Sequence, residues 1–284
     1  MLNSSGSKIY DANTDAIAAN ITLSNLASSE TLNHSGTASV GSANAGSYTI
    51  TNLSGVSIAD GSNGGLASNY TLTGGTHNFT VNQRAISLSG TRLYDATTNA
   101  AASDLSTMAN LVGSETLTLS GTGSIASANV SSNKTVTTGT LALADGSNGG
   151  LAANYTLSGG THQLTVNQRP LIATLARQYD ATTTAAGSDL SSFNDLQGGE
   201  TLSVSGSGTA TSANVANSIA MANNGTLALA DGTGLASNYS LNSTIINISQ
   251  RVLSSSGSKI YDANTDAIAA NITCLLYTSD AADE

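Results

Sequence analysis

A Tyr-Asp dipeptide recurs four times along this chain of 284 residues, at nearly equal intervals. It begins at positions 10, 94, 179 and 261, which are 84, 85 and 82 residues apart (94 − 10, 179 − 94 and 261 − 179). Three landmarks follow it in a fixed order: Glu-Thr-Leu from Glu30, Glu115 and Glu200, Asn-Tyr ending at Tyr70, Tyr155 and Tyr239, and Gln-Arg ending at Arg84, Arg169 and Arg251. Self-similarity at a fixed period predicts a chain built from similar structural units.

The landmarks divide the chain into three near-complete modules, residues 1–84, 85–169 and 170–251, and a truncated fourth, residues 252–273. Within the fourth, residues 255–273 repeat residues 4–22 without a change. Residues 274–284, CLLYTSDAADE, break the repeat and resemble the translation of a sequencing adapter. We interpret them as an artefact and exclude them from fold reasoning. Without their three acidic residues, the formal net charge changes from −10 to −7.

Apolar residues alternate with polar ones inside each module, as expected for strands with one buried face. Examples are Leu117 and Leu119, Leu141 and Leu143, Leu164 and Val166, Val56 and Ile58, Phe79 and Val81, Leu227 and Leu229, and Ile246 and Ile248. Glycine-rich turns separate these runs, and Gly74-Gly75 and Gly159-Gly160 predict hairpins. A short helical turn is expected within residues 104–112. The pattern predicts an all-β fold of tandem small antiparallel β-sandwich modules, Ig-like or β-grasp-like. A β-solenoid is the alternative, but its coils of about 20–30 residues are shorter than the repeat.

Composition limits the functions of the chain. Charged residues are 9% of the sequence and the net charge is negative, so no basic surface for nucleic acid is expected. No apolar run of about 18 residues predicts a membrane span. The first residues lack the pattern of an export signal, so we expect any such signal outside the given sequence. Cys274 is the one cysteine, which excludes a disulfide within the chain.

Seven of the eight basic residues occupy two recurring places. Three end the modules, and four lie two residues before the tyrosine: Lys8, Arg92, Arg177 and Lys259. One interpretation is a repeated ligand patch. The interpretation that we favour is a structural ion pair or a solvated face, which contributes about 0–1 kcal/mol when it is exposed.

The sequence contains no set of residues at spacings suited to catalysis or metal binding. His34, His77 and His162 have no partners at zinc-ligand spacing, and no nucleophile with a plausible triad stands out. We therefore predict no catalytic, cofactor-binding or metal-binding residues. The Gly-rich loops after Asp60 and Asp145 are predicted to be β-turns; calcium binding there stays open, as does glycosylation of the many Asn-x-Ser/Thr tripeptides.

The pattern Lys/Arg-x-Tyr-Asp-Ala-x-Thr, followed by Glu-Thr-Leu and Asn-Tyr-Thr/Ser-Leu, resembles the YDG repeats of bacterial exoproteins. The resemblance covers essentially all of residues 1–273. The sequence departs from the family at the third letter, where Ala12, Ala96, Ala181 and Ala263 stand in place of glycine. Ala43-Asn44-Ala45-Gly46 is similar to the family's Asn-Val-Gly motif, which weakens in the later modules.

The resemblance implies a non-enzymatic segment of a large adhesin-like or filamentous-haemagglutinin-like protein, exported to the bacterial surface or medium, often by two-partner secretion. Its role would be that of a stalk, a spacer or an adhesive array for cell adhesion. Expected partners are neighbouring modules and host or bacterial surface glycans or proteins. The alternative function is a carbohydrate-binding module in which Tyr70, Tyr155 and Tyr239 stack on sugars. A packing role for these tyrosines is favoured, because each lies inside an alternating run.

Overall fold

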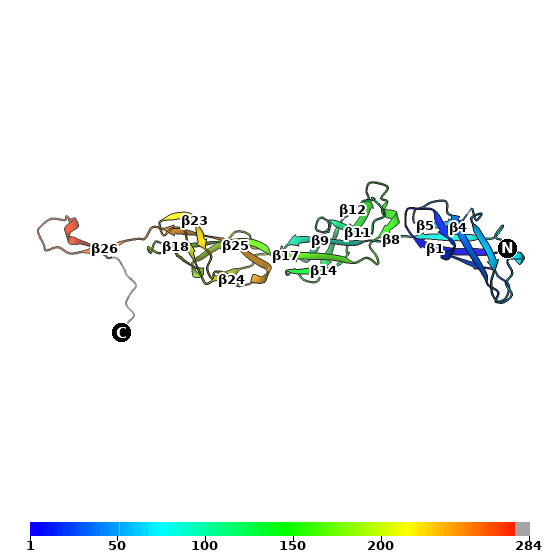
Figure 1. Ribbon diagram of the computed structural model, residues 1–284. Helices are drawn as coiled ribbons and strands as arrows, with labels where there is room; N and C mark the ends of the chain where they lie inside the picture. Colours follow the sequence, from blue (N-terminus) through cyan, green and yellow to red (C-terminus); the bar gives the residue numbers. More distant parts are fainter. Residues whose placement is uncertain (51, 276–284) are drawn as a thin grey trace. The chain divides into compact units, whose positions relative to one another are not determined.

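The computed structural model describes residues 1–50 and 52–275, without the side chains of residues 274 and 275 (Figure 1). Strands dominate it, which confirms the all-β prediction. The helical elements of the described chain are 3₁₀ turns of three residues: η1 (Ala18–Asn20), η2 (Ala67–Asn69), η3 (Ala102–Asp104), η4 (Ala152–Asn154), η5 (Gly187–Asp189), η6 (Ala236–Asn238) and η7 (Ala269–Asn271). None of them is long and apolar enough to cross a membrane. Most of the predicted adapter-derived tail lies outside the described residues.

The short helical turn expected within residues 104–112 was placed wrongly. The 3₁₀ turn η3 ends at Asp104, and Thr107–Ala109 forms the strand β11. The 3₁₀ turn lies earlier in the chain than expected because Asp104 caps it. The Asp104 carboxylate accepts a hydrogen bond from the backbone N–H of Ala101 at 3.2 Å.

Contacts divide the chain into two units, Met1–Asn167 and Gln168–Glu284. The first unit contains two modules. Its first module has the strands β1 (Asn3–Ile9), β2 (Asp15–Ile17), β3 (Ile21–Ser24), β4 (Leu32–Ser39), β5 (Gly46–Thr49), β6 (Val56–Asp60) and β7 (His77–Asn82). Its second has β8 (Arg84–Ala85), β9 (Ser87–Leu93), β10 (Asn99–Ala101), β11, β12 (Leu117–Ser120), β13 (Thr122–Ile125), β14 (Ser131–Thr137), β15 (Ala142–Asp145), β16 (Tyr155–Thr156) and β17 (His162–Asn167).

The second unit contains the third module and the strands that follow it. These are β18 (Arg169–Gln178), β19 (Thr184–Ala186), β20 (Leu190–Phe193), β21 (Leu202–Ser205), β22 (Ser207–Ala210), β23 (Ala216–Asn223), β24 (Ala228–Asp231) and β25 (Tyr239–Ser249), then β26 (Ser254–Gly257) and β27 (Ile272–Leu275). Residues 252–273 are almost all exposed, so the third module folds without burying the partial copy.

Each module has a larger and a smaller sheet. In the second module the larger sheet has the order β10-β13-β14-β17-β9-β11, and β12 pairs with β15 in the smaller one. The third module repeats this arrangement as β19-β22-β23-β25-β18-β20 and β21-β24. Most pairs are antiparallel, but the first and last long strands of every module pair in parallel: β1 with β7, β9 with β17 and β18 with β25. Because the strands pair within each module, the chain forms separate modules and not a solenoid.

The core of each module lies under this parallel pair. The alternating residues predicted to face inward do so: Phe79, Val81, Leu164, Val166, Ile246 and Ile248 are each at most 1% exposed. The smaller sheet is more shallowly buried, since Leu117 is 9% exposed and Leu119 is half-buried. In the third module Leu175, Ala185, Ala210 and Ile219 complete the apolar cluster around β25.

The hairpins predicted at the Gly-Gly pairs were wrong. The segments before and after Gly159-Gly160 are β16 and β17, which pair with β8 and β9 rather than with each other. In the third module the corresponding segment lacks the glycines, and β25 runs through without a break beside β18. The Gly-Gly turn is therefore a looped-out part of one long strand. Alternation within the two runs could not reveal this, because it indicates a buried face and not the pairing partner.

In the second and third modules a glycine marks the point where the chain passes from the smaller sheet to the larger one: Gly121 between β12 and β13, and Gly206 between β21 and β22, with φ angles of 85° and 79°. Gly36 of the first module lies within β4 and has a φ angle of 96°. A Cβ atom at Gly121 would lie 2.2 Å from the carbonyl oxygen of Thr140. Glycine is thus required both by the backbone conformation and by the close approach of the neighbouring strand.

Replacing Gly121 by alanine should lower the free energy of unfolding by about 3 kcal/mol, from conformational strain together with a backbone clash. Gly113→Ala is the matched control, because Gly113 has a φ of 56° but no atom within 4 Å of the place that a Cβ atom would take. It should cost only about 1 kcal/mol. Denaturant unfolding followed by circular dichroism measures both; equal costs would contradict the close approach of the neighbouring strand.

Candidate functional site: the Tyr-Asp-Ala loop and the module junction

The Tyr-Asp-Ala loop follows the first long strand of every module and is closed by an ion pair. The basic residue two positions before the tyrosine contacts the aspartate in all four copies: Lys8 with Asp11 at 2.8 Å, Arg92 with Asp95, Arg177 with Asp180, and Lys259 with Asp262 at 3.0 Å. In the three complete modules the cationic side chain is 6–9% exposed. We favoured an ion pair or a solvated face, and the structure shows an ion pair with a buried cation and a carboxylate that is 36–43% exposed.

Burial by itself would raise the pKa of the Asp11 carboxyl. The hydrogen bond from Lys8 and that from the backbone N–H of Asn13 outweigh burial and hold this pKa below its ordinary value. The pKa of Asp180 is lowered in the same way, against burial, by the hydrogen bonds from Thr182 and Arg177. Both carboxyls are thus ionised acceptors that fix the loop.

The basic residue is matched to the residue two positions after the aspartate. Lys8 Nζ donates to both the backbone oxygen and the side-chain Oδ1 of Asn13, each at 2.7 Å. Arg92 donates to the backbone oxygen of Thr97 at 2.5 Å and to its Oγ1 at 3.0 Å. The other copies keep the pairing, Lys259 with Asn264 and Arg177 with Thr182. The compact ammonium meets the longer amide, and the long guanidinium fork meets the shorter hydroxyl.

We predict that Arg92→Lys alone lowers the free energy of unfolding by about 1 kcal/mol, because the ammonium cannot serve both groups of Thr97. The double variant Arg92→Lys, Thr97→Asn recreates the pairing of Lys8 and Asn13 and should recover most of that loss. A double-mutant cycle by denaturant unfolding measures the coupling, which should be about 1 kcal/mol. Strictly additive single effects would show that the two positions are independent.

The alanine of the loop adopts a backbone conformation that favours glycine. Ala12, Ala96, Ala181 and Ala263 have φ angles of 64°, 60°, 66° and 63°. A left-handed conformation costs a residue with a Cβ atom roughly 1–2 kcal/mol. This explains physically why a glycine fits the third position of a Tyr-Asp-Gly motif, and it shows that alanine is accepted here at the cost of strain.

Ala96→Gly should therefore raise the free energy of unfolding, by up to about 1 kcal/mol after the greater entropy of the unfolded chain is subtracted. Ala142→Gly is the control, since Ala142 is exposed in the strand β15. There the same substitution should lower stability by about 0.5–1 kcal/mol. Thermal and denaturant unfolding of the two variants shows whether each substitution raises or lowers the free energy of unfolding. A lower free energy of unfolding for both variants would contradict backbone strain at Ala96.

A tyrosine bonds to a glutamate inside every module. The hydroxyls of Tyr70, Tyr155 and Tyr239 donate to Glu30, Glu115 and Glu200, the latter two at 2.6 and 2.7 Å. A backbone N–H donates to each hydroxyl in turn, from Ala27, Val112 and Gln197. Each tyrosine therefore connects the Glu-Thr-Leu segment to the end of the module through both hydrogen-bonding functions of its hydroxyl.

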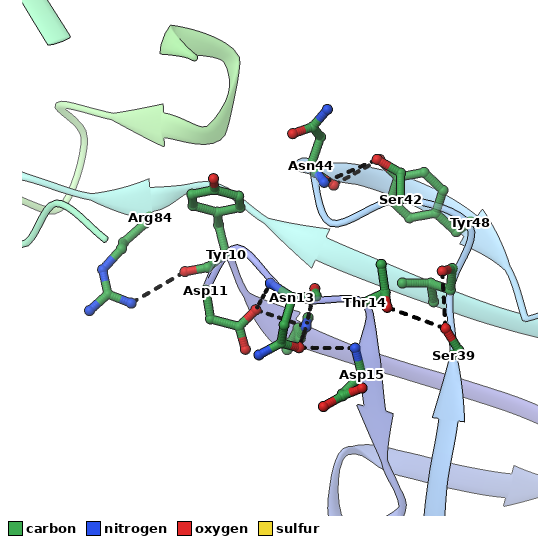
Figure 2. A network of polar contacts seen from close by, with 12 residues as sticks. Tyr10, Asp11, Asn13, Thr14, Asp15, Ser39, Ser42, Asn44, Tyr48 and Arg84 are labelled. Atoms are coloured by element: carbon green, nitrogen blue, oxygen red, sulfur yellow. Dashed lines mark hydrogen bonds and ion pairs between the residues drawn. The ribbon is translucent and has the colours of Figure 1, made fainter. Parts of the chain in front are cut away.

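At the junction between the first two modules, Glu115 accepts a second tyrosine. The hydroxyl of Tyr10, from the loop of the first module, donates to Glu115 Oε1 at 2.6 Å, while Tyr155 occupies Oε2. The two rings meet edge to face, with centroids 5.4 Å apart and an interplanar angle of 76°, a favoured aromatic geometry. Tyr10 is 3% and Tyr155 2% exposed. Figure 2 shows Tyr10 above the hydrogen-bonded loop that holds it.

Polar contacts flank the tyrosines at this junction. Asn154, which is fully buried, accepts the backbone N–H of Ala45 at 2.8 Å and donates to Asn44 Oδ1 at 3.1 Å. Arg84 donates to the backbone oxygen of Tyr10 at 3.2 Å (Figure 2) and to that of Asn110 at 2.8 Å. The landmarks of one module and the next thus converge in space, which joins the modules through directional bonds.

Burial is the largest cause that raises the pKa of Tyr10 and of Tyr155, each to about 12, and the hydrogen bond and charge of Glu115 add to it. The pKa of Tyr239 rises to about 12 through burial and Glu200. The neutral phenol is therefore favoured in the folded state. Between pH 10 and about 12 the folded chain retains protons that the unfolded chain has lost, so stability falls as pH rises through this window.

We predict that the free energy of unfolding is constant just below pH 10 and declines above it, on the order of 1 kcal/mol per pH unit for each buried tyrosine. Absorbance at 295 nm should show a late set of tyrosines that titrates near pH 12. Tyr155→Phe should shrink the late set. The absence of this late set in the native protein would contradict the buried, hydrogen-bonded hydroxyls.

Other residues singled out in the sequence also have structural contacts. The Nε2 atoms of His77 and His162 bond to backbone oxygens of Leu72 and Leu157 at 2.7 and 2.9 Å, across the Gly-Gly turns. Asp60 and Asp145 each accept a backbone N–H across their loops at 2.7 Å, from Ala67 and Ala152. Within the described residues, no three His, Cys, Asp or Glu side chains form a group that could hold a metal ion.

The acceptor role of Glu115 was not foreseen from the sequence. The Glu-Thr-Leu landmark served only to mark the repeat, because a glutamate after a turn usually lies in solvent. The sequence did contain one indication of this contact, the constant distance between the glutamate and the tyrosine of the Asn-Tyr landmark. Glu30 and Tyr70 are 40 residues apart, and so are Glu115 and Tyr155.

The fold defines a class of tandem all-β modules, and the first two are joined by hydrogen bonds between their repeated motifs. The YDG domain family matches three successive segments, residues 2–78, 76–165 and 161–246. The chain therefore belongs to the YDG domain family. Comparison with curated proteins and with solved structures found no match.

Proposed function

We propose that the chain is a non-catalytic structural segment of a large adhesin-like bacterial protein at the cell surface or in the medium, and that it acts as a stalk, a spacer or an adhesive array. The junction of Tyr10, Glu115 and Tyr155 carries this proposal. Its bonds give one module a defined attachment to the next. A chain of modules that are attached in this way transmits force and sets a distance, whereas freely hinged modules would do so poorly.

The carboxylate and imidazole side chains support a structural role, because they form ion pairs and hydrogen bonds within the fold. Aspartates of the loops are ion-paired, Glu115 accepts two tyrosines, and His162 holds the Gly-Gly turn. Partners of the segment would be neighbouring modules and, in an adhesive array, surface glycans or proteins, where many weak contacts add up through avidity.

The carbohydrate-binding alternative depends on exposed tyrosine rings. Tyr155 and Tyr239 are each 2% exposed, so their rings are not available for stacking as the chain is folded. Tyr70 is half-buried and is the remaining ring of the three. We therefore favour the structural role, and a glycan array probed with the chain and with Tyr70→Ala separates the two functions: binding that is lost in the variant would support the alternative.

Force spectroscopy on the full chain tests the structural role. Pulling from the two ends should give three unfolding steps of similar length, each roughly 28–30 nm for about 84 residues at 3.3–3.6 Å per residue. Glu115→Gln should lower the force of the steps that involve the first two modules, while Asp266→Asn, an exposed carboxylate elsewhere, should not. Extension without distinct steps would contradict a series of modules that resists force.

A further inference from the structure

Two tyrosine rings from different modules lie against each other at the junction of the first unit. The centroids of Tyr10 and Tyr155 are 5.4 Å apart, and the rings meet edge to face at an interplanar angle of 76°. The rings are 3% and 2% exposed, so the surrounding segments hold them in this arrangement. The two residues are 145 positions apart in the sequence (155 − 10), and the fold therefore creates their contact.

The two hydroxyls converge on one carboxylate. Tyr10 donates to Oε1 of Glu115 and Tyr155 donates to Oε2, each at 2.6 Å. Phenoxyl radicals couple at the ring carbons next to the carbon that carries the oxygen, so the reactive carbons of the two rings also lie close together. Proximity of this kind converts a reaction between two molecules into a step within one.

Glu115 is placed to accept the proton that a phenol loses when it is oxidised. Removal of an electron makes a phenol strongly acidic, and a carboxylate that is already hydrogen-bonded to the hydroxyl takes the proton without rearrangement. Glu115 is half-buried, so it can pass a first proton to water before it receives a second. The oxidant has only to remove electrons, and burial of the rings therefore does not prevent the reaction.

We propose that the junction is a site of oxidative crosslinking, at which Tyr10 and Tyr155 form dityrosine with peroxide as the oxidant and a haem peroxidase as its catalyst. Each phenol gives one electron to the oxidant and its hydroxyl proton to Glu115. A C–C bond then forms between the carbons next to the two oxygen-bearing carbons. The hydrogen on each of these carbons moves as a proton to the ring oxygen, which restores both aromatic rings. In total two electrons and two protons leave the rings, and they reduce one peroxide to two waters.

The crosslink would change how the segment responds to load, a consequence that rests on the proposed function. A bond between positions 10 and 155 closes a loop that a force applied to the chain ends cannot extend. The loop contains most of the first two modules and has a contour length of roughly 48–52 nm at 3.3–3.6 Å per residue. Oxidation would thus remove the extensible length of these two modules and retain that of the third.

Mass spectrometry of the full chain tests the crosslink directly. After treatment of a dilute solution with peroxide and a haem peroxidase, the monomer should lose the mass of two hydrogen atoms for each bond formed. Tandem mass spectrometry of a digest should locate a bond between Tyr10 and Tyr155. Tyr10→Phe and Tyr155→Phe keep the rings but should each lose this product. Tyr261→Phe, which alters a ring that is 89% exposed, should retain it.

Glu115→Gln tests the role of the carboxylate. A neutral amide does not take up the proton, so the yield of the bond between Tyr10 and Tyr155 should fall at least about tenfold. Glu30→Gln is the matched control, because Glu30 accepts the Tyr70 hydroxyl at the corresponding position of the first module, and the yield there should be unchanged. Near-ultraviolet circular dichroism shows whether the rings keep their packing in each variant.

Three results would overturn the proposal: an oxidised chain without the bond, an equal yield of the bond in a chain unfolded by denaturant, or an equal yield in Glu115→Gln. Force spectroscopy separates this inference from the proposed function. The oxidised chain should show one long unfolding step, that of the third module, where the untreated chain shows three. If the bond forms but the untreated chain extends without distinct steps, the proposed function fails and the crosslinking site stands.

Discussion

A half-buried carboxylate, that of Glu115, accepts two phenol hydroxyls, and the described junction depends on this interaction. Removing a carboxylate from water is costly unless hydrogen bonds replace the lost hydration. Glu115 obtains them from Tyr10 and Tyr155, both at 2.6 Å, and bonds to a charged acceptor are the stronger kind. One of these donors belongs to another module, so the module that carries the carboxylate is best satisfied when its neighbour is in place.

The low content of charged and aromatic residues agrees with a fold in which a few such side chains make the specific contacts. Small and polar residues are sufficient for strands whose outer faces meet water, and the few large or charged side chains lie at recurring positions. The basic residues close loops, as Arg92 does with Asp95, and the tyrosines connect segments far apart in sequence, as Tyr155 does with Glu115. The loop contacts are local, and the tyrosine contacts supply the long-range order.

The sequence predicted those features that depend on a local pattern. Alternation identified the buried residues Leu164 and Val166, and the recurring basic residues indicated an ion pair or a solvated face, of which the structure shows the ion pair. It did not predict the parallel pairing of β9 with β17, because alternation reveals a face and not a direction. The positive φ of Ala96 was missed as well, since alanine, unlike glycine, gives no signal for this conformation.

The Tyr-Asp-Ala loop orients the tyrosine that forms the junction. Tyr10 immediately precedes the ion-paired Asp11 and the left-handed Ala12, so the contacts that fix these two residues also fix the direction of the ring. Arg84 holds the backbone oxygen of Tyr10 from the other side. The strain at the alanine is offset by the hydrogen bonds to Asp11. A ring that is oriented in advance loses little conformational entropy when it meets its carboxylate, and preorganisation of this kind strengthens a contact of small area.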